Sequence, residues 1–118
     1  MDILKSFHDL RVWQEAHAYV LEIYKTTKQF PSDEKFGLTS QLRRSAVSVA
    51  SNIVEGFKRR GQDSVRFYTI SEASLEESRY QVLLSKDLKY LPEEIFFNLE
   101  KRAIMIAKML YKFKKTQF

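Results

Sequence analysis

The sequence has 118 residues, of which 44% are apolar and 30% are charged, and its formal net charge is +5. This length suits one domain around a single core, and only three Gly and two Pro exclude a β-sandwich or barrel, which needs many turns. The absence of cysteine excludes disulfides, thiolate metal sites and a cysteine nucleophile, and it is consistent with a cytoplasmic protein.

Helical periodicity and helix start signals divide the chain into four segments. Pro31 followed by Ser32, and Pro92 followed by Glu93, combine a proline with the polar or acidic residues that favour the first turn of a helix. Gly61 separates the second segment from the third. We therefore predict helices near residues 8–29, 32–58, 63–89 and 92–115. Four such helices with short connections predict an all-α fold, a single antiparallel up-down-up-down four-helix bundle over residues 1–118.

The second helix is apolar on two faces. Leu42 and Val49 lie on the face that we expect to form the core. A second apolar strip, about 140° away around the helix, consists of Val47, Ala50 and Val54. A helix of this kind is either central in its domain or packed against another chain, and no helix is central in a four-helix bundle. We therefore predict that the second strip lines a homo-oligomer interface; the alternative is an apolar surface without a partner.

Polar residues on the second and third helices have two interpretations. In the first, Glu55 pairs with Arg59 or Arg44 along its own helix and is largely solvated. In the second, a buried polar cluster fixes the helix register; its members would be Arg44, Asn52, Glu55, Ser74 and Glu77. The residues alone favour neither. We predict that the serines of the third helix are packing residues, hydrogen-bonded to a carbonyl one turn back, and not nucleophiles.

Cations gather in two places. One group surrounds the second connection and the other ends the fourth helix, and we expect these groups at opposite ends of the bundle, as two separate patches. Each is a candidate nucleic-acid-binding site, and the alternative for each is a solvated helix end, where cations favour the helix dipole. Phe67 and Tyr68 could stack on bases, although Phe67 is better explained as a core residue. The candidate nucleic-acid-binding residues are Lys58, Arg59, Arg60, Arg66, Lys112, Lys114 and Lys115.

Catalytic and metal-binding constellations are missing from the sequence. Its only histidines are His8 and His17, and Glu15 stands two residues from His17, which puts the two side chains on different helix faces. The glycines of "GFKRRG" lack the lysine and hydroxyl of a phosphate-binding loop. We therefore expect no catalytic residues, no metal, no cofactor and no enzymatic activity. No apolar run suits a signal peptide or a membrane span, so we expect no membrane partner.

Three stretches of the chain resemble a known family. They are "DLRVWQEAHAYVLEIYKTTKQFPSDEKFGL", "SQLRRSAVSVASNIVEG" and "FYTISEASLEES". Together they resemble the 23S rRNA intervening-sequence proteins, a bacterial family of four-helix bundles that is also called the S23 ribosomal protein family, over about residues 7–91. The resemblance implies an antiparallel four-helix bundle. A related branch, the accessory proteins of diversity-generating retroelements, forms basic pentamers that bind nucleic acid and associate with a reverse transcriptase.

The expected function combines these observations. We expect a non-enzymatic homo-oligomer, a pentamer by resemblance, that binds RNA or DNA with little sequence specificity. The alternative is a protein–protein interaction adaptor, for example a reverse-transcriptase accessory protein, whose basic patches meet an acidic protein without direct contact to nucleic acid.

Overall fold

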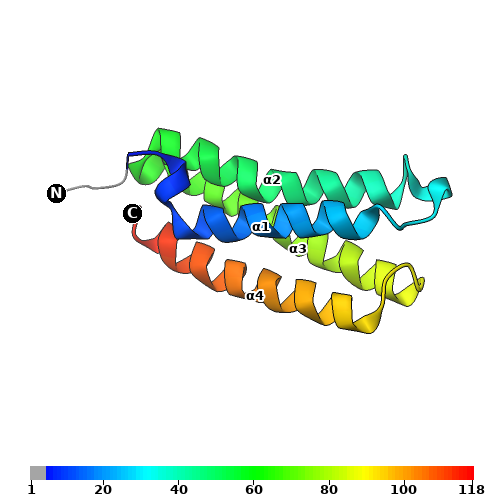
Figure 1. Cartoon of the computed structure of the whole chain (residues 1–118). Coiled ribbons are helices and arrows are strands. Elements are labelled where there is room, and N and C mark those ends of the chain that lie inside the picture. The colour runs from blue at the N-terminus through cyan, green and yellow to red at the C-terminus, as the bar shows by residue number, and fades with distance from the viewer. Residues whose placement is uncertain (1–4) are drawn as a thin grey trace.

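The computed structural model describes residues 5–118 and confirms the predicted four-helix bundle (Figure 1). Within that range the chain forms no strand. The four long helices run alternately up and down and are joined by short connections. Their bounds are α1 Arg11–Thr27, α2 Leu38–Arg59, α3 Val65–Asp87 and α4 Glu93–Lys115.

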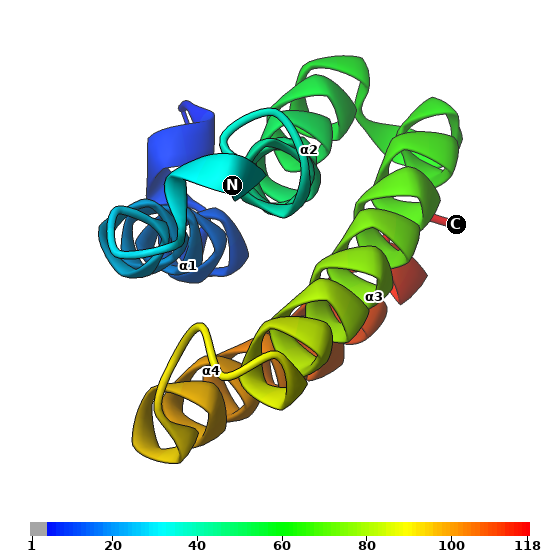
Figure 2. The same cartoon turned by 90° about the vertical axis from the view of Figure 1, so that its right-hand side faces the viewer.

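Helices that follow one another in sequence are neighbours in the bundle, and α4 closes the ring against α1 (Figure 2). The molecule is elongated, with principal extents of 49 × 25 × 20 Å. Each helix contributes one apolar stripe to a continuous core, as the helical period of the sequence predicts. Residues without measurable exposure in this core include Ala16, Tyr19, Ile23, Leu42, Ala46, Val49, Ile53, Ile106 and Leu110.

The second helix begins six residues later than predicted, while the other predicted bounds lie within three residues of those observed. Ser32–Glu34 forms a short 3-10 helix, and Gly37, with φ −111 and ψ −117, interrupts the helical backbone before Leu38. Glu34 Oε1 accepts a hydrogen bond from the backbone N–H of Leu38 at 3.0 Å. Glu34 therefore precedes this helix and caps the backbone N–H group of its first residue.

The seam between α2 and α3 is polar and closely packed. Ser71 Oγ donates a hydrogen bond across the seam to the Val49 carbonyl at 2.7 Å. Ser78 Oγ and Ser85 Oγ each donate to a carbonyl about one turn back in α3, and both residues are fully buried. Small hydrogen-bonded side chains let two helices approach without leaving a buried polar group unpaired. Ser78 and Ser85 are packing residues with the predicted bond one turn back, whereas the hydroxyl of Ser71 bonds across to α2.

Tyr68 joins three helices at one end of the bundle. It is only 1% exposed, its ring contacts Gly56 of α2, and its ring centroid lies 5.2 Å from that of Phe113 in α4. A methyl group on Gly56 would overlap the Tyr68 ring, so glycine is what permits this close approach of α2 and α3. Burial raises the pKa of Tyr68 to about 12. The sequence expectation is reversed here, because Tyr68 is a core residue and Phe67 is partly exposed.

At the other end, a tyrosine joins the α1–α2 and α3–α4 connections. Tyr90 Oη donates a hydrogen bond to Glu34 Oε2 at 2.8 Å, and the Tyr90 ring lies 5.5 Å from that of Phe30. The hydrogen bond from the Leu38 N–H, followed by that from Tyr90, lowers the pKa of Glu34. The same bond to Glu34 raises the pKa of Tyr90. One carboxylate thus caps α2 and holds two connections together.

Candidate nucleic-acid interface

The two groups of cations meet at one end of the bundle, so the prediction that they lie at opposite ends is wrong. In an up-down-up-down bundle α2 and α4 run in the same direction, and their C-termini must lie together. Lys114 Nζ of α4 donates a hydrogen bond to Glu72 Oε1 of α3 at 2.7 Å, two turns from the α2–α3 connection. Figure 1 shows the C-terminus of the chain at this end. We call it the basic end; its cations are Lys58, Arg59, Arg60, Arg66, Lys112, Lys114 and Lys115.

The α2–α3 connection reverses the chain sharply. Arg60 and Gly61 have successive positive φ angles, 60 and 57. Gly61 adopts this conformation without a steric penalty, while Arg60 is an uncommon non-glycine case. The Arg60 guanidinium lies 4.8 Å from the centroid of the Phe57 ring, which packs against the core. The turn therefore presents a cation at the tip of the connection on a fixed backbone.

Two further arginines flank the Phe67 ring beside this turn. The guanidinium carbon of Arg59 lies 5.3 Å from the ring centroid, and that of Arg66 lies 4.7 Å from it. Asp63 lies within ion-pair distance of both, with Oδ2 at 3.8 Å from Arg59 Nη1 and Oδ1 at 3.9 Å from Arg66 Nε. All three charged side chains are about half exposed or more. Ring contacts and a shared counter-ion therefore hold both guanidiniums at the surface.

The C-terminal turns of α4 supply lysines of two kinds. Lys114 points between α3 and α4, where its side chain is 18% exposed and paired with Glu72. Lys112 and Lys115 are exposed, and Lys115 Nζ lies 5.1 Å from the centroid of the Tyr111 ring. Of the predicted α4 residues, Lys112 and Lys115 are therefore placed to meet a ligand, while Lys114 serves mainly to hold α4 against α3.

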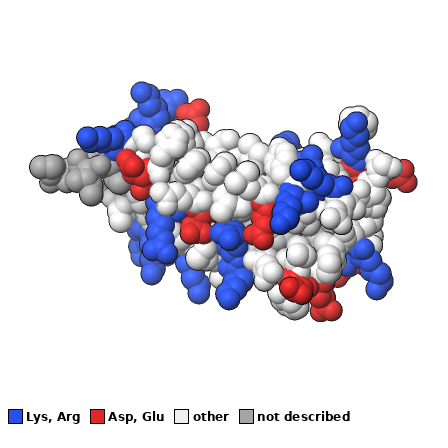
Figure 3. Space-filling view, viewed as in Figure 1, with Lys and Arg blue, Asp and Glu red and all other residues white. Residues whose placement is uncertain are grey.

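A lysine strip extends the basic end along the outer face of α4, farther than the predicted group of cations at the end of this helix. Intervals of seven, four and three residues put its members on one side of the helix, over about 21 Å of helix axis. These intervals were a readable signal. Figure 3 shows Lys and Arg side chains at the α2–α3 connection and along the α4 edge, with other cations toward the opposite end. The strip consists of Lys101, Lys108, Lys112 and Lys115, all exposed.

Comparison with known proteins identifies the family. The family model for the 23S rRNA-intervening sequence protein matches residues 8–112. The chain belongs to this family. It is also similar to a protein of unknown function from the S23 ribosomal protein family of Bacteroides thetaiotaomicron VPI-5482, at 19% sequence identity and a TM-score of 0.79 over 88% of this chain and 95% of that chain. That similarity shows the fold alone. No curated protein matches the chain.

The predicted polar cluster divides into separate contacts. Arg44 Nη2 donates to Glu77 Oε2 at 3.0 Å, on the surface between α2 and α3. Glu55 is exposed and forms no hydrogen bond or ion pair with any residue in the range 5–118. The structure thus places Glu55 outside the cluster and in solvent. It also removes the helical pairs considered for Glu55, since Arg44 pairs with Glu77 and Arg59 with Asp63.

Asn52 and Ser74 meet through Ser48. The Ser48 and Ser74 hydroxyls lie 2.8 Å apart, and Asn52 Nδ2 donates to the Ser48 carbonyl at 2.9 Å. All three belong to the seam between α2 and α3, where Asn52 and Ser48 are half-buried and Ser74 is buried. The seam therefore contains a small polar network that lacks both of the predicted carboxylates.

The predicted interface residues do not form a continuous exposed strip. Val47 is 37% exposed, while Ala50 and Val54 are half-buried and Ala50 packs against the core. Because α2 contacts both α1 and α3, it has two buried flanks even without a second chain, which the sequence argument overlooked. The homo-oligomer stays a prediction. Other apolar side chains that are at least as exposed lie on α3 and α4; they are Ile70, Tyr80, Leu83, Phe97, Ile104 and Tyr111.

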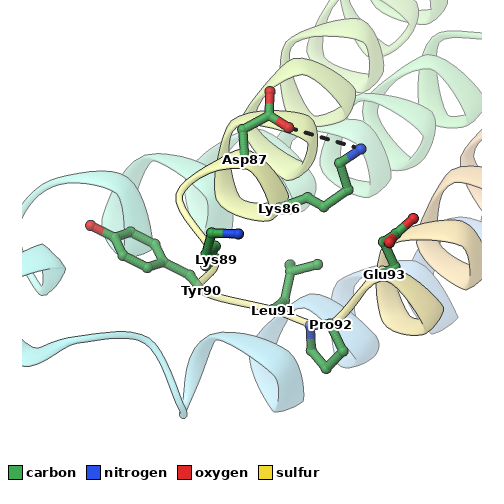
Figure 4. A pocket seen from close by; sticks show the side chains of 7 residues that line it. All are labelled: Lys86, Asp87, Lys89, Tyr90, Leu91, Pro92 and Glu93. Atoms are coloured by element: carbon green, nitrogen blue, oxygen red, sulfur yellow. Dashed lines mark ion pairs between the residues drawn. The ribbon is translucent and has the colours of Figure 1, made fainter.

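A surface pocket beside the α3–α4 connection lies far from the basic end (Figure 4). Its lining mixes both charges, with Lys86 Nζ 3.8 Å from Asp87 Oδ1 and with Lys89 and Glu93 alongside. Because these lysines and carboxylates offset one another's charge, the pocket favours neither an anionic nor a cationic ligand. Within residues 5–118 no group of three or more His, Asp or Glu is placed to hold a metal ion. No helix of that range is long and apolar enough to cross a membrane.

Proposed function

We propose that this protein is a non-enzymatic nucleic-acid-binding protein that contacts the phosphate backbone through its basic end. One observation carries the proposal: cations about 50 residues apart in the sequence lie together at one end of the bundle. The α2–α3 connection contributes three arginines and Lys58, and α4 contributes the lysine strip. Cations at opposite ends would each attract phosphates weakly, whereas cations gathered at one end can contact several phosphates of a single strand or duplex.

Four side chains at this end are available to a ligand. Lys58 and Lys112 are exposed and have no acidic partner among the residues that the structure describes. Arg59 and Arg66 are exposed, and both are oriented by Phe67. Contacts from such cations to phosphates carry no sequence information. The Phe67 ring beside the connection is flanked by arginines, so base stacking is a minor contribution and binding should be weakly sequence-specific.

Three alanine variants test the proposal, each removing three positive charges. Binding of a fluorescently labelled RNA duplex and of the DNA duplex of equal length is measured by anisotropy between about 50 and 200 mM salt. The connection variant carries Lys58→Ala, Arg59→Ala and Arg66→Ala. The α4 variant carries Lys108→Ala, Lys112→Ala and Lys115→Ala. The far-end control, with the same loss of charge near the α1–α2 connection, carries Lys25→Ala, Lys28→Ala and Lys35→Ala.

The connection and α4 variants should each weaken binding and flatten the log–log salt slope by about two to three units for duplex DNA, since each phosphate contact contributes about 0.9. The far-end control should leave the slope unchanged. Equal effects of all three variants would show that net charge, and not the basic end, governs binding. No binding by the wild type at low salt would reject this function and favour the adaptor, whose basic end would meet an acidic protein such as a reverse transcriptase.

We also propose that the protein forms a closed homo-oligomer, as the resemblance to pentameric relatives implies. Val47 on α2 is the exposed member of the predicted interface. A second candidate surface lies beside the lysine strip on α4, where Phe97, Ile104 and Tyr111 recur at intervals of seven residues and are 37–58% exposed. Either contact would place several basic ends on one particle and multiply the positive charge that meets a nucleic acid.

A further inference from the structure

Asp63 lies between two arginines at the basic end, Arg59 and Arg66. Its two carboxylate oxygens face different arginines, with Oδ2 toward Arg59 and Oδ1 toward Arg66, at 3.8 and 3.9 Å. A phosphodiester also presents two anionic oxygens with one shared charge. The carboxylate is therefore a chemical analogue of the expected ligand, placed between two guanidiniums.

The hydrogen-bond donors of the two arginines have no acceptor among residues 5–118. The distances to Asp63 exceed those of charge-assisted hydrogen bonds, which lie near 2.7–2.9 Å. Neither Arg59 nor Arg66 donates a hydrogen bond to any other residue of the described chain. Elsewhere in the molecule arginines do bond their carboxylates closely, as Arg79 does with Glu100 at 2.9 and 3.0 Å. The pair at the basic end is thus oriented by Phe67 and Asp63 but keeps its donors for a ligand.

We propose that Arg59 and Arg66 form a clamp for one backbone phosphate of a nucleic acid, and that Asp63 is its built-in competitor. In the free protein Asp63 neutralises and orients both guanidiniums. When the strand arrives, its phosphate takes the position of the carboxylate and receives the unused N–H groups, while Asp63, which is 57% exposed, turns toward solvent. This inference rests on the proposed function, and it names both a phosphate-binding pair and the group that limits its affinity.

The proposal predicts that removing the competitor strengthens binding. Asp63→Asn keeps the shape of the side chain and removes its charge. We expect a three- to tenfold gain in affinity for the labelled RNA duplex at low salt, the scale expected from loss of two exposed ion pairs plus a nearby repulsive charge. The gain should shrink as salt rises, because the competing interactions are screened.

A matched control separates the clamp from net charge. Asp87→Asn makes the same change of charge in an exposed aspartate at the opposite end of α3. The two aspartates are separated by most of the helix, about 33 Å, which is several screening lengths at 0.1 M salt. Asp87→Asn should therefore leave affinity unchanged. In a protein that already carries Arg59→Ala and Arg66→Ala, Asp63→Asn should no longer raise affinity, because the clamp that it competes for is gone.

The outcomes are distinguishable. A gain specific to Asp63→Asn that disappears in the double-arginine background supports the clamp. Equal effects of Asp63→Asn and Asp87→Asn, or a gain that persists without the arginines, overturn the clamp while leaving nucleic-acid binding in place. No binding by wild type or by Asp63→Asn overturns both proposals. Inorganic phosphate, added at constant ionic strength, should barely displace the duplex, since other contacts retain the strand; strong displacement would mean that the pair recognises free phosphate and would overturn its assignment to the nucleic-acid backbone.

Discussion

Replacing Gly56 by Ala should destabilise the protein, although alanine is the better helix former. The new methyl group would overlap the Tyr68 ring, with the ring carbon Cζ at 2.7 Å. That ring cannot move aside freely, because Phe113 packs against it and the residue is 1% exposed. Overpacking of this kind costs about 1–3 kcal/mol, and we expect the upper half of that range. The helix propensity of alanine returns about 0.8–1.0 kcal/mol, which leaves a net loss of about 1–2 kcal/mol.

Urea denaturation monitored by circular dichroism measures this loss, with Ser51→Ala as the matched control. Ser51 is an exposed position of the same helix, so its replacement should change the free energy of unfolding by no more than about 0.5 kcal/mol. An unchanged slope of free energy against urea would show that the loss is a change in stability. If Gly56→Ala is as stable as wild type, or more stable by the amount that propensity alone predicts, the packing argument for this end of the bundle is wrong.

Three further outcomes are expected. Glu55→Ala should change the free energy of unfolding by less than about 0.5 kcal/mol in urea melts, since the side chain is exposed and has no partner in residues 5–118. A loss above about 2 kcal/mol would instead support the buried polar cluster. The lowered pKa of Glu34 stabilises the fold above the unfolded value near 4.5, and that contribution is lost as pH falls through the folded pKa. Tyr90→Phe removes one of its two donors, so the fall in urea midpoint between about pH 6 and pH 3 should be smaller than in wild type. Light scattering after size exclusion should give a molar mass above that of one chain. Val47→Glu should produce monomers if α2 forms the contact, and Phe97→Glu should do so if α4 forms it. A wild-type monomer at micromolar concentration would refute self-association.

The fold was predictable because each level of the sequence supports the same arrangement. Apolar residues follow the helical period, prolines and acidic residues mark the starts, and the connections are too short for any other path. The start of α2 was not predictable in detail. Ser32 and Glu34 are typical of the first turn of a helix, and only the backbone conformation at Gly37 shows that the α-helix begins at Leu38.

The sequence predicts only part of the candidate site. The basic groups share one end because α2 and α4 run in the same direction. This placement was therefore predictable from the order of the helices, although the prediction put the groups at opposite ends. The exposure of Glu55 was not predictable, because a rotation of the helix by one residue, about 100°, decides whether a side chain faces α3 or solvent. The position of Asp63 between Arg59 and Arg66 depends on the positive φ angle of Arg60, which no residue pattern predicts.

An even number of helices also has a practical consequence for anyone handling this protein. The first described residues and the last ones emerge beside the cations (Figure 1). An affinity tag, a fused domain or a surface linkage at either terminus would therefore crowd the very region whose binding is to be measured. The loop around Phe36, whose side chain is 88% exposed at the opposite end, is the better place for a dye or an anchor.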